Sequence, residues 1–186
     1  SIVIILLESH GLNYVDTYGA GSYEHLPSSP YLSRLAREYI SFANYYQSGY
    51  ATLSASWSLL SGFPYFHESA YTPQLARLGA IANFQDQGYH CEWLKSANVL
   101  FGNFNELTQN LGIETGPNKE EAARMEARDD SLWTGWGMPD EQLFEIAFER
   151  IAQRVESGDG PFLEFILSVS NHNPFTLPET IDGHVL

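Results

Sequence analysis

The sequence has very little positive charge and one cysteine, and each shortage excludes a class of protein. Lysine and arginine together number 9 against 23 acidic residues, which leaves a formal net charge of -14. Nucleic acids and anionic membrane surfaces need basic patches on their direct partners, so neither is expected to bind this chain. Cys91 stands alone, so the chain forms no internal disulfide. Its aromatic and apolar neighbours predict a buried strand thiol rather than a reactive one.

Long apolar runs are missing as well. No hydrophobic stretch reaches the roughly 20 residues that a helix needs to cross a bilayer. No signal peptide is recognisable, because Ser1 leads directly into an apolar strand, and we expect the natural start to lie upstream. The 186 residues, 44% of them hydrophobic, suffice for one sizeable core but not comfortably for two. We therefore expect a single domain over residues 1–186.

Apolar patterns predict strands that alternate with helices. Continuous apolar runs of strand length cover Ile2–Leu7, Ile40–Tyr46, Tyr89–Leu94 and Pro161–Val169. Apolar residues at helical spacing, with proline starts or glycine stops, predict helices that begin near Pro30, Thr52, Pro73, Asn103, Lys119 and Pro139. Helices between strands imply crossover connections, so we expect an α/β fold with a mainly parallel sheet and helices on both faces.

Three polar groups share one placement, because each follows a predicted strand. They are the carboxylate of Glu8, the hydroxyl of Thr52 at the start of a helix and the imidazole of His172. The carboxyl ends of parallel strands meet at one edge of a sheet, where open α/β sheets bind ligands. These groups suit metal-assisted attack on a phosphoryl group: the carboxylate holds the cation and the hydroxyl attacks. The imidazole would then position or protonate an oxygen of the substrate or leaving group.

Each of these residues also has a purely structural interpretation. Thr52 could cap the free N–H groups of the helix that it opens, a role worth on the order of 1 kcal/mol. Glu8 could be a solvated loop acid or a cap, and His172 could serve only the structure of its loop. The pattern by itself leaves these alternatives open.

Four segments together resemble the sulfatase-like catalytic domain of lipoteichoic acid synthases, in the same order and over nearly the whole chain. They read IVIILLESHG, SPYLSRLAREYISFANYYQSGYATLSA, WGMPDEQLF and SNHNPFTLPE. Bacterial phosphoglycerol and phosphoethanolamine transferases belong to the same alkaline phosphatase superfamily. The resemblance implies an alkaline phosphatase/sulfatase-like fold, of which this chain would be the N-terminal portion.

The resemblance also implies roles for the site residues. Glu8 would bind one divalent cation, usually Mn²⁺, with Mg²⁺, Ca²⁺ or Zn²⁺ as alternatives. Thr52 would be the nucleophile and second ligand, and His172 would line the substrate site. Where the family places a Trp and an Arg near the substrate phosphate, residues 100–106 read LFGNFNE without an arginine. The acceptor or head group is therefore expected to differ, and Asn103 is a candidate for a polar contact there.

Two departures from classical sulfatases favour the transferase branch. Glu8 is followed by Ser9 rather than by a second aspartate, and no Pro-Ser-Arg follows Thr52. The leading hypothesis is a metal-dependent phosphotransferase that moves a phosphoglycerol- or phosphoethanolamine-type head group through a phosphothreonine. A hydrolase (sulfatase, phosphatase or phosphodiesterase) and a degenerate non-catalytic domain are the alternatives. Asp140, in the motif WGMPDE, could cap a helix or take part in catalysis.

The resemblance places the domain outside the bacterial cytoplasmic membrane, tethered by upstream helices, with a phospholipid or glycan head group as substrate. A catalytic metal usually has three or four protein ligands. The family's remaining pair is an Asp-His dipeptide that this chain lacks, and Asp16, Asp86 and Asp182 are the candidates to replace it. We therefore expect an N-terminal fragment with an exposed sheet edge or apolar face. Alone it should bind Mn²⁺ weakly and turn over nothing.

Overall fold

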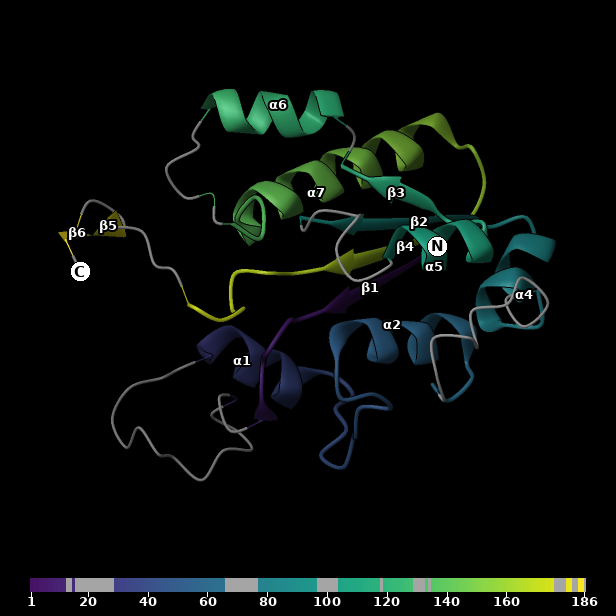
Figure 1. Cartoon of the computed structure of the whole chain (residues 1–186), viewed down its shortest axis with the longest axis horizontal. Helices are drawn as coiled ribbons and strands as arrows, with labels where there is room; N and C mark the ends of the chain where they lie inside the picture. The colour runs from purple at the N-terminus through teal and green to yellow at the C-terminus, as the bar shows by residue number, and fades with distance from the viewer. Residues whose placement is uncertain are drawn as a thin grey trace. The chain divides into compact units, whose positions relative to one another are not determined.

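The computed structural model describes most of the chain as two compact units. One unit joins Ser1–Glu8 to Ser48–Leu186 and is called the sheet unit here; the other is Ser9–Gln47. The described residues are 1–12, 15, 29–65, 77–96, 104–117, 119–128, 133, 135–175, 180–181 and 184–185. Strands and helices alternate along the sheet unit, which confirms the predicted α/β class (Figure 1). The expected single domain over residues 1–186 stays a prediction.

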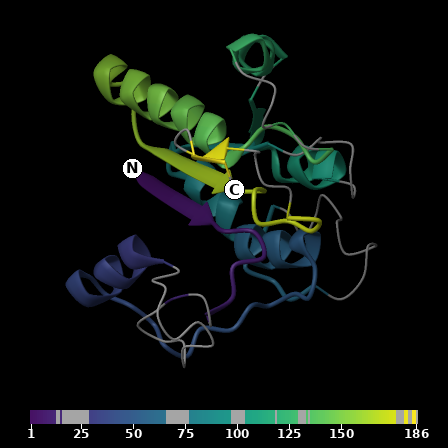
Figure 2. The same cartoon turned by 90° about the vertical axis from the view of Figure 1, so that its left-hand side faces the viewer.

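A four-stranded parallel sheet organises the sheet unit. Its spatial order is β1 (Ile2–Leu6), β4 (Phe162–Leu167), β2 (His90–Lys95) and β3 (Glu114–Gly116). All three neighbouring pairs are parallel, and Figure 2 shows the arrows of β1 and β4 pointing the same way. The sequence did not predict β3, because three residues are too short for a periodic signal. A separate antiparallel pair joins β5 (Thr180–Ile181) to β6 (His184–Val185).

Helices cover both faces of the sheet, as predicted. The lower face in Figure 1 carries α2 (Thr52–Ser61), α4 (Ala80–Asp86) and α5 (Phe104–Leu111). The upper face carries α6 (Lys119–Arg128) and α7 (Asp140–Ser157). In the unit Ser9–Gln47, α1 (Pro30–Glu38) begins with the proline that the sequence placed at its first position. Of the helices that the structure describes, none combines the length and apolarity that crossing a bilayer requires.

Side chains that alternate along the strands build two apolar cores. Trp93 and Phe165 face α2 and α5, and their rings pack edge to face with centroids 5.5 Å apart. Leu94 and Ile166 point the other way and pack in the core that includes Leu143 of α7. Cys91 is buried in the first core, as its neighbours predicted. Strands covered on both faces therefore hold the centre of the sheet.

The outer strand β1 is less well covered. Among the described strands it pairs with β4 alone. Val3 and Ile5, on one of its faces, are 42% and 47% exposed. The exposed edge and apolar face that the sequence led us to expect are therefore present at β1.

The predicted strand at Ile40–Tyr46 is wrong. These residues form turns and irregular chain, and the side chains of Phe42, Tyr45 and Tyr46 are exposed. The segment also belongs to the unit Ser9–Gln47 and not to the sheet unit. Aromatic and β-branched residues favour a strand only where a neighbouring strand and a buried face receive them.

The predicted start of a helix at Pro73 lies outside the described residues, because residues 66–76 are not among them. Leu78, expected to line that helix, lies in a turn and is 69% exposed. Helix α4 begins at Ala80, directly after Gly79. Glycine is a poor interior helix residue, which explains why the helix starts after it and not before it.

Candidate functional site

A pocket within the sheet unit opens at the carboxyl edge of the sheet. Its cavity volume is about 50 Å³. A single water fills roughly 10–15 Å³ by such a measure, so the cavity accepts a few water-sized atoms, comparable to a tetrahedral phosphate or sulfate group. The residues that line it are Glu8, Thr52, Lys95, Phe104, Trp136, Leu167, Ser168, Val169 and His172. Glu8, Thr52 and His172 thus meet at one place, while Asn103 lies outside the described residues.

Glu8 is held by the strand that neighbours its own. Its backbone N–H donates to Ser168 Oγ at 2.9 Å. The N–H of Ser168 in turn donates to the carbonyl of Leu6 at 3.1 Å. These two bonds join the end of β1 to the end of β4, so the Glu8 carboxylate is carried by the sheet and not by a loose loop.

Thr52 is the first residue of α2 and not its cap. The Ser54 hydroxyl closes the helix start instead: it accepts from the Ala51 N–H at 3.2 Å and donates to the Ala51 carbonyl at 2.9 Å. Thr52 Oγ1 donates to Glu8 Oε2 at 2.9 Å. Gly49 permits this tight entry, because a Cβ there would lie 2.5 Å from Ser54 Oγ. The hydroxyl of Thr52 therefore faces a carboxylate beside the positive end of a helix.

His172 lies in the turn that follows β4. Its backbone N–H donates to the Val169 carbonyl at 2.8 Å, and its ring packs against Trp136 with centroids 3.9 Å apart. Its Nδ1 lies 2.8 Å from the Asn173 carbonyl, which can only accept. Nδ1 therefore carries a proton, and Nε2 is the ring nitrogen suited to exchange a proton with a substrate. The Trp136 indole N–H donates to the same carbonyl at 2.9 Å.

Asp140 positions this turn from the start of α7. Its Oδ1 accepts the backbone N–H groups of Val169 at 2.6 Å and Ser170 at 3.1 Å. Its own N–H donates to Ser170 Oγ at 2.9 Å. The side chain makes no cap bond to α7, so the helix-cap interpretation of Asp140 is wrong. Asp140 instead ties α7 to the turn that carries His172.

Lys95 is a pocket residue that the sequence analysis missed. It is the last residue of β2 and is 2% exposed. Its Nζ lies 4.0 Å from the centroid of the Phe104 ring, within cation–π range. Burial lowers the pKa of Lys95 to about 8. A lysine directly after the apolar pair Trp93-Leu94 at a strand end was the available signal, in a chain whose other lysine is Lys119.

Glu8 and Thr52 fit part of a divalent-cation site. They offer a carboxylate and a hydroxyl oxygen, donors that suit Mg²⁺ and Mn²⁺. Their contact at 2.9 Å puts both within reach of one ion. Within the described ranges, no three His, Cys, Asp or Glu residues gather closely enough to hold a metal. Asp86 ends α4 and is not a pocket residue, and Asp16 and Asp182 lie outside the described residues.

Comparison with known proteins identifies the family. The family model described as sulfatase matches residues 1–184, so this chain belongs to the sulfatase family. A solved structure of a protein in the alkaline phosphatase superfamily from Vibrio parahaemolyticus matches with a TM-score of 0.79 at 24% identity, covering 97% of this chain and 42% of that chain. The lipoteichoic acid synthase LtaP from Listeria monocytogenes matches with a TM-score of 0.74 at 20% identity, covering 98% and 44%. These likenesses confirm the predicted fold. This chain spans less than half the length of either solved structure.

Proposed function

We propose that this member of the sulfatase family transfers a phosphoglycerol- or phosphoethanolamine-type head group through a covalent intermediate on Thr52. Membership of the family supports phosphoryl or sulfuryl transfer or hydrolysis in general. The observation that carries the finer proposal is the 2.9 Å hydrogen bond from Thr52 Oγ1 to Glu8 Oε2. A threonine hydroxyl is a weak nucleophile unless an adjacent group activates it, and this contact supplies such a group.

In the first step, Thr52 Oγ1 attacks phosphorus and the bond from phosphorus to the leaving oxygen breaks. The proton of Thr52 departs along its hydrogen bond to Glu8 Oε2. The leaving oxygen takes a proton from Nε2 of His172, which starts this step as an imidazolium because its Nδ1 keeps the proton that it donates to the Asn173 carbonyl; the ring ends the step neutral. The product of this step is a phosphothreonine ester that carries the head group.

In the second step, the hydroxyl of an acceptor attacks the phosphothreonine. Its proton passes to Nε2 of His172, the bond from phosphorus to Thr52 Oγ1 breaks, and that oxygen recovers a proton from Glu8. The packing of His172 on Trp136 keeps the imidazole at the pocket through both steps. Acid and base roles thus alternate on one nitrogen, as reversal of the same chemistry requires.

A divalent cation would be held by Glu8 and Thr52, together with ligands not identified among the described residues. When bound, it would stabilise the charge that develops on the nucleophile and on the phosphoryl oxygens. Mn²⁺ is the proposed ion, with Mg²⁺, Ca²⁺ or Zn²⁺ as alternatives. The cation requirement is tested by removing metal with a chelator and restoring activity with each ion in turn.

The proposed substrate is a phospholipid or glycan head group at the outer face of a bacterial cytoplasmic membrane. The support is the likeness in fold to a lipoteichoic acid synthase. Contact with the membrane would come from other segments of the protein, since the acidic chain itself, with a net charge of -14, does not suit an anionic surface.

The deciding experiment compares Thr52→Ala, Thr52→Ser and Thr108→Ala in the intact protein. Thr108 is a matched control, because its hydroxyl bonds to the backbone of its own helix α5 and does not line the pocket. We expect Thr52→Ala to abolish turnover, Thr52→Ser to retain part of it and Thr108→Ala to leave it intact. Mass spectrometry should find the head-group adduct on Thr52 in the wild type. Near-wild-type turnover by Thr52→Ala would exclude the mechanism.

The same assay separates transfer from hydrolysis. Labelled head group recovered on an acceptor indicates a transferase, whereas release of free phosphate, phosphate ester or sulfate indicates a hydrolase. Both outcomes keep Thr52 as the nucleophile, since only the second attacking molecule differs.

A further inference from the structure

The parallel ladder between β1 and β4 stops short of Glu8. Its last aligned pair is Leu6 with Leu167. One further bond continues the regular pattern, from the Ser168 N–H to the Leu6 carbonyl at 3.1 Å. The next bond of an evenly spaced parallel ladder would run from the Glu8 N–H to the Ser168 carbonyl. That N–H instead donates to the hydroxyl oxygen of Ser168 at 2.9 Å, so a side chain replaces the main chain at the end of the ladder.

The direction of the Glu8 side chain follows from the alternation along β1. Ile4 and Leu6 pack in the core that α2 and α5 cover, and Glu8 is the next position with the same period of two. Its carboxylate accordingly receives the Thr52 hydroxyl, at the start of α2, at 2.9 Å. The alternation holds only while the chain stays beside β4 as far as Glu8. The bond to Ser168 keeps it there, two residues beyond the last residue of β1.

The chain leaves the sheet directly after this contact. Ser9 has a backbone φ of 51°, in the left-handed region that residues other than glycine seldom occupy. Glu8 is therefore the last position that β4 can fix. Ser168 itself is 2% exposed and lines the pocket. A buried acceptor holds its donor in one geometry, because water does not readily take its place.

We infer that Ser168 is a positioning residue, whose hydroxyl oxygen fixes Glu8 and thereby directs its carboxylate to Thr52 and to the divalent cation. This inference rests on the proposed function for the roles of Glu8 and Thr52. Ser168 acts through the backbone of Glu8, because its oxygen accepts the Glu8 N–H. Removal of a residue that orients a metal ligand typically lowers metal affinity or activity by about 10- to 100-fold.

The test is calorimetric titration of Mn²⁺ into the intact protein and its variants. Ser168→Ala removes the acceptor, Ser168→Cys keeps the shape but offers only a weak sulfur acceptor, and Ser168→Thr keeps the hydroxyl. Ser61→Ala is the matched control. Ser61 is also 2% exposed, and its hydroxyl accepts the Phe63 N–H at 3.1 Å, but it does not line the pocket.

We expect Ser168→Ala and Ser168→Cys to weaken Mn²⁺ binding at least about tenfold. Ser168→Thr should recover most of the affinity, because the hydroxyl oxygen returns. Ser61→Ala should keep the wild-type affinity, although both alanine variants should lower the melting temperature by leaving a backbone N–H without its acceptor. In the metal-free protein, NMR should find faster hydrogen exchange of the Glu8 amide in Ser168→Ala and not in Ser61→Ala.

The control separates positioning of Glu8 from a general loss of stability, and Ser168→Cys keeps the test valid if the alanine variant fails to fold. Mn²⁺ affinity within about twofold of the wild type in the alanine and cysteine variants overturns the inference, as does a wild type that binds no Mn²⁺. Neither measurement depends on covalent chemistry. Turnover by Thr52→Ala, with Mn²⁺ binding weakened in Ser168→Ala but not in Ser61→Ala, would reject the covalent role of Thr52 and leave the positioning of Glu8 in place.

Discussion

Lys95 and Glu164 are buried charges in neighbouring strands, yet they lie in different surroundings. Lys95 is 2% exposed, ends β2 and faces the pocket beside α2 and α5. Glu164 is 0% exposed, lies in the middle of β4 and faces α7. The two charges are therefore buried for different reasons. Lys95 lies at the carboxyl end of a strand, where parallel sheets bind ligands. Glu164 lies under a helix that carries opposite charges.

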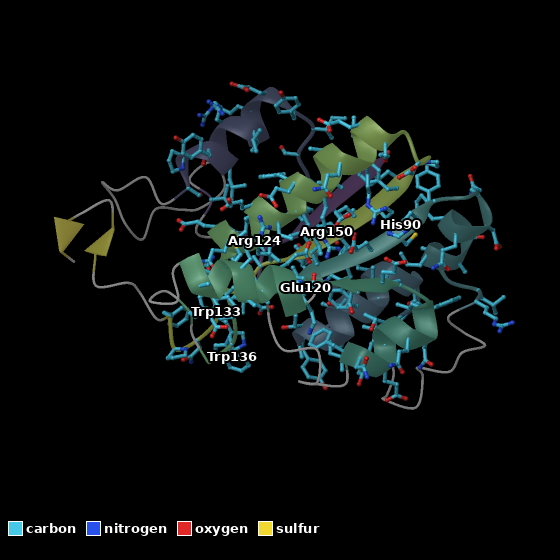
Figure 3. All side chains as sticks on the ribbon, turned by 90° about the horizontal axis from the view of Figure 1, so that it is seen from above. His90, Glu120, Arg124, Trp133, Trp136 and Arg150 are labelled. Carbon is cyan, nitrogen blue, oxygen red and sulfur yellow. The ribbon has the colours of Figure 1, made fainter. Side chains whose placement is uncertain are left out.

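The charges around Glu164 form a network between the sheet and α7. Glu164 aligns with Glu92 of β2. Arg150 bonds to one oxygen of Glu92, and Arg154 Nη2 lies 3.0 Å from the other. Arg150 also bonds to Glu121 of α6 at 2.5 Å. Figure 3 shows Arg150 over the strands, away from Trp136 near the pocket.

Glu164 itself is only partly compensated. Among the described residues its oxygens have no hydrogen-bond partner. Burial raises its pKa to about 7, although Arg154 and Arg150 oppose that rise. The α7 face therefore holds a network of charges from several elements, whereas the pocket face holds Lys95 against the Phe104 ring. Four predictions test this contrast, and the one with the largest expected effect comes first.

Arg150→Met should cause the largest loss of stability. The side chains of Arg150 and Glu92 are 17% and 2% exposed, and removal of one partner leaves the Glu92 carboxylate undercompensated. The expected loss is on the order of 3–5 kcal/mol in the free energy of unfolding, measured by urea denaturation. The double variant Arg150→Met/Glu92→Gln should recover part of the loss, because the uncompensated charge is gone as well. A loss in the double variant equal to the sum of both single losses would show that the two side chains are not coupled.

Glu164→Gln should make the free energy of unfolding less dependent on pH. With the pKa of Glu164 raised from 4.5 to about 7, the folded state binds a proton that the unfolded state releases between these values. Stability from this group is therefore full below about pH 4.5 and is lost as pH rises through about 7. The loss is on the order of 3 kcal/mol, so Glu164→Gln should be the more stable protein above that pH.

The measurement is urea denaturation of the wild type and Glu164→Gln at several pH values from 5 to 8, in the manner of a linkage experiment. The difference between the two proteins isolates Glu164 from His90, a neighbour whose pKa is lowered, mainly by burial. Glu156→Gln, which alters an exposed acid near the end of α7, is the matched control and should follow the wild type. Parallel curves for the wild type and Glu164→Gln would contradict the prediction.

Asp140→Ala should lower both the stability of the protein and its kcat. It removes the acceptor of two backbone N–H groups and should cost about 2 kcal/mol. Because those bonds hold the turn of His172, kcat should fall more than KM changes if His172 transfers protons as proposed. Asp140→Asn, which keeps an acceptor oxygen, should recover much of both. An unchanged kcat in a destabilised Asp140→Ala would show that the turn holds its shape without this anchor.

Arg124→Ala should have the smallest effect. Its pair with Glu149 joins α6 to α7 at 2.7 Å, but the two side chains are 51% and 43% exposed. Water and salt screen such a pair, so denaturation should detect no change. A clear loss of stability in Arg124→Ala would show that an exposed ion pair on the α7 face contributes as much as the buried ones do, which would contradict the prediction.

Local patterns accounted for most of the regular structure. The strand at Ile2–Leu7 and the helices at Thr52 and Lys119 were predicted within a residue or two of their observed bounds. The strand at Ile40–Tyr46 was not observed, and β3 was not predicted. Both errors concern strands, whose existence depends on a partner strand elsewhere in the chain and not on neighbours in the sequence.

The residues of the candidate site were likewise predicted only in part. Placement after predicted strands picked out Glu8, Thr52 and His172, which line one pocket. The parallel sheet explains the meeting of Glu8 and His172, which follow β1 and β4. Thr52 reaches the pocket from the start of α2, because the segment Ile40–Tyr46 before it is not a strand. The sequence did not predict Lys95 as a site residue, because a lysine at a strand end is ordinarily exposed.

Local sequence patterns sufficed to predict the α/β class, the alternation of helices and strands and the identity of three polar groups. These depend on composition and on periods of two and 3.6 residues, which are local properties. The folded chain was needed to reveal the order of the strands, the contact of Thr52 with Glu8 and the burial of two opposite charges on opposite faces of the sheet. Those features arise from residues as far apart as Glu8 and Ser168. Their pairing depends on packing across the sheet, which no local pattern records.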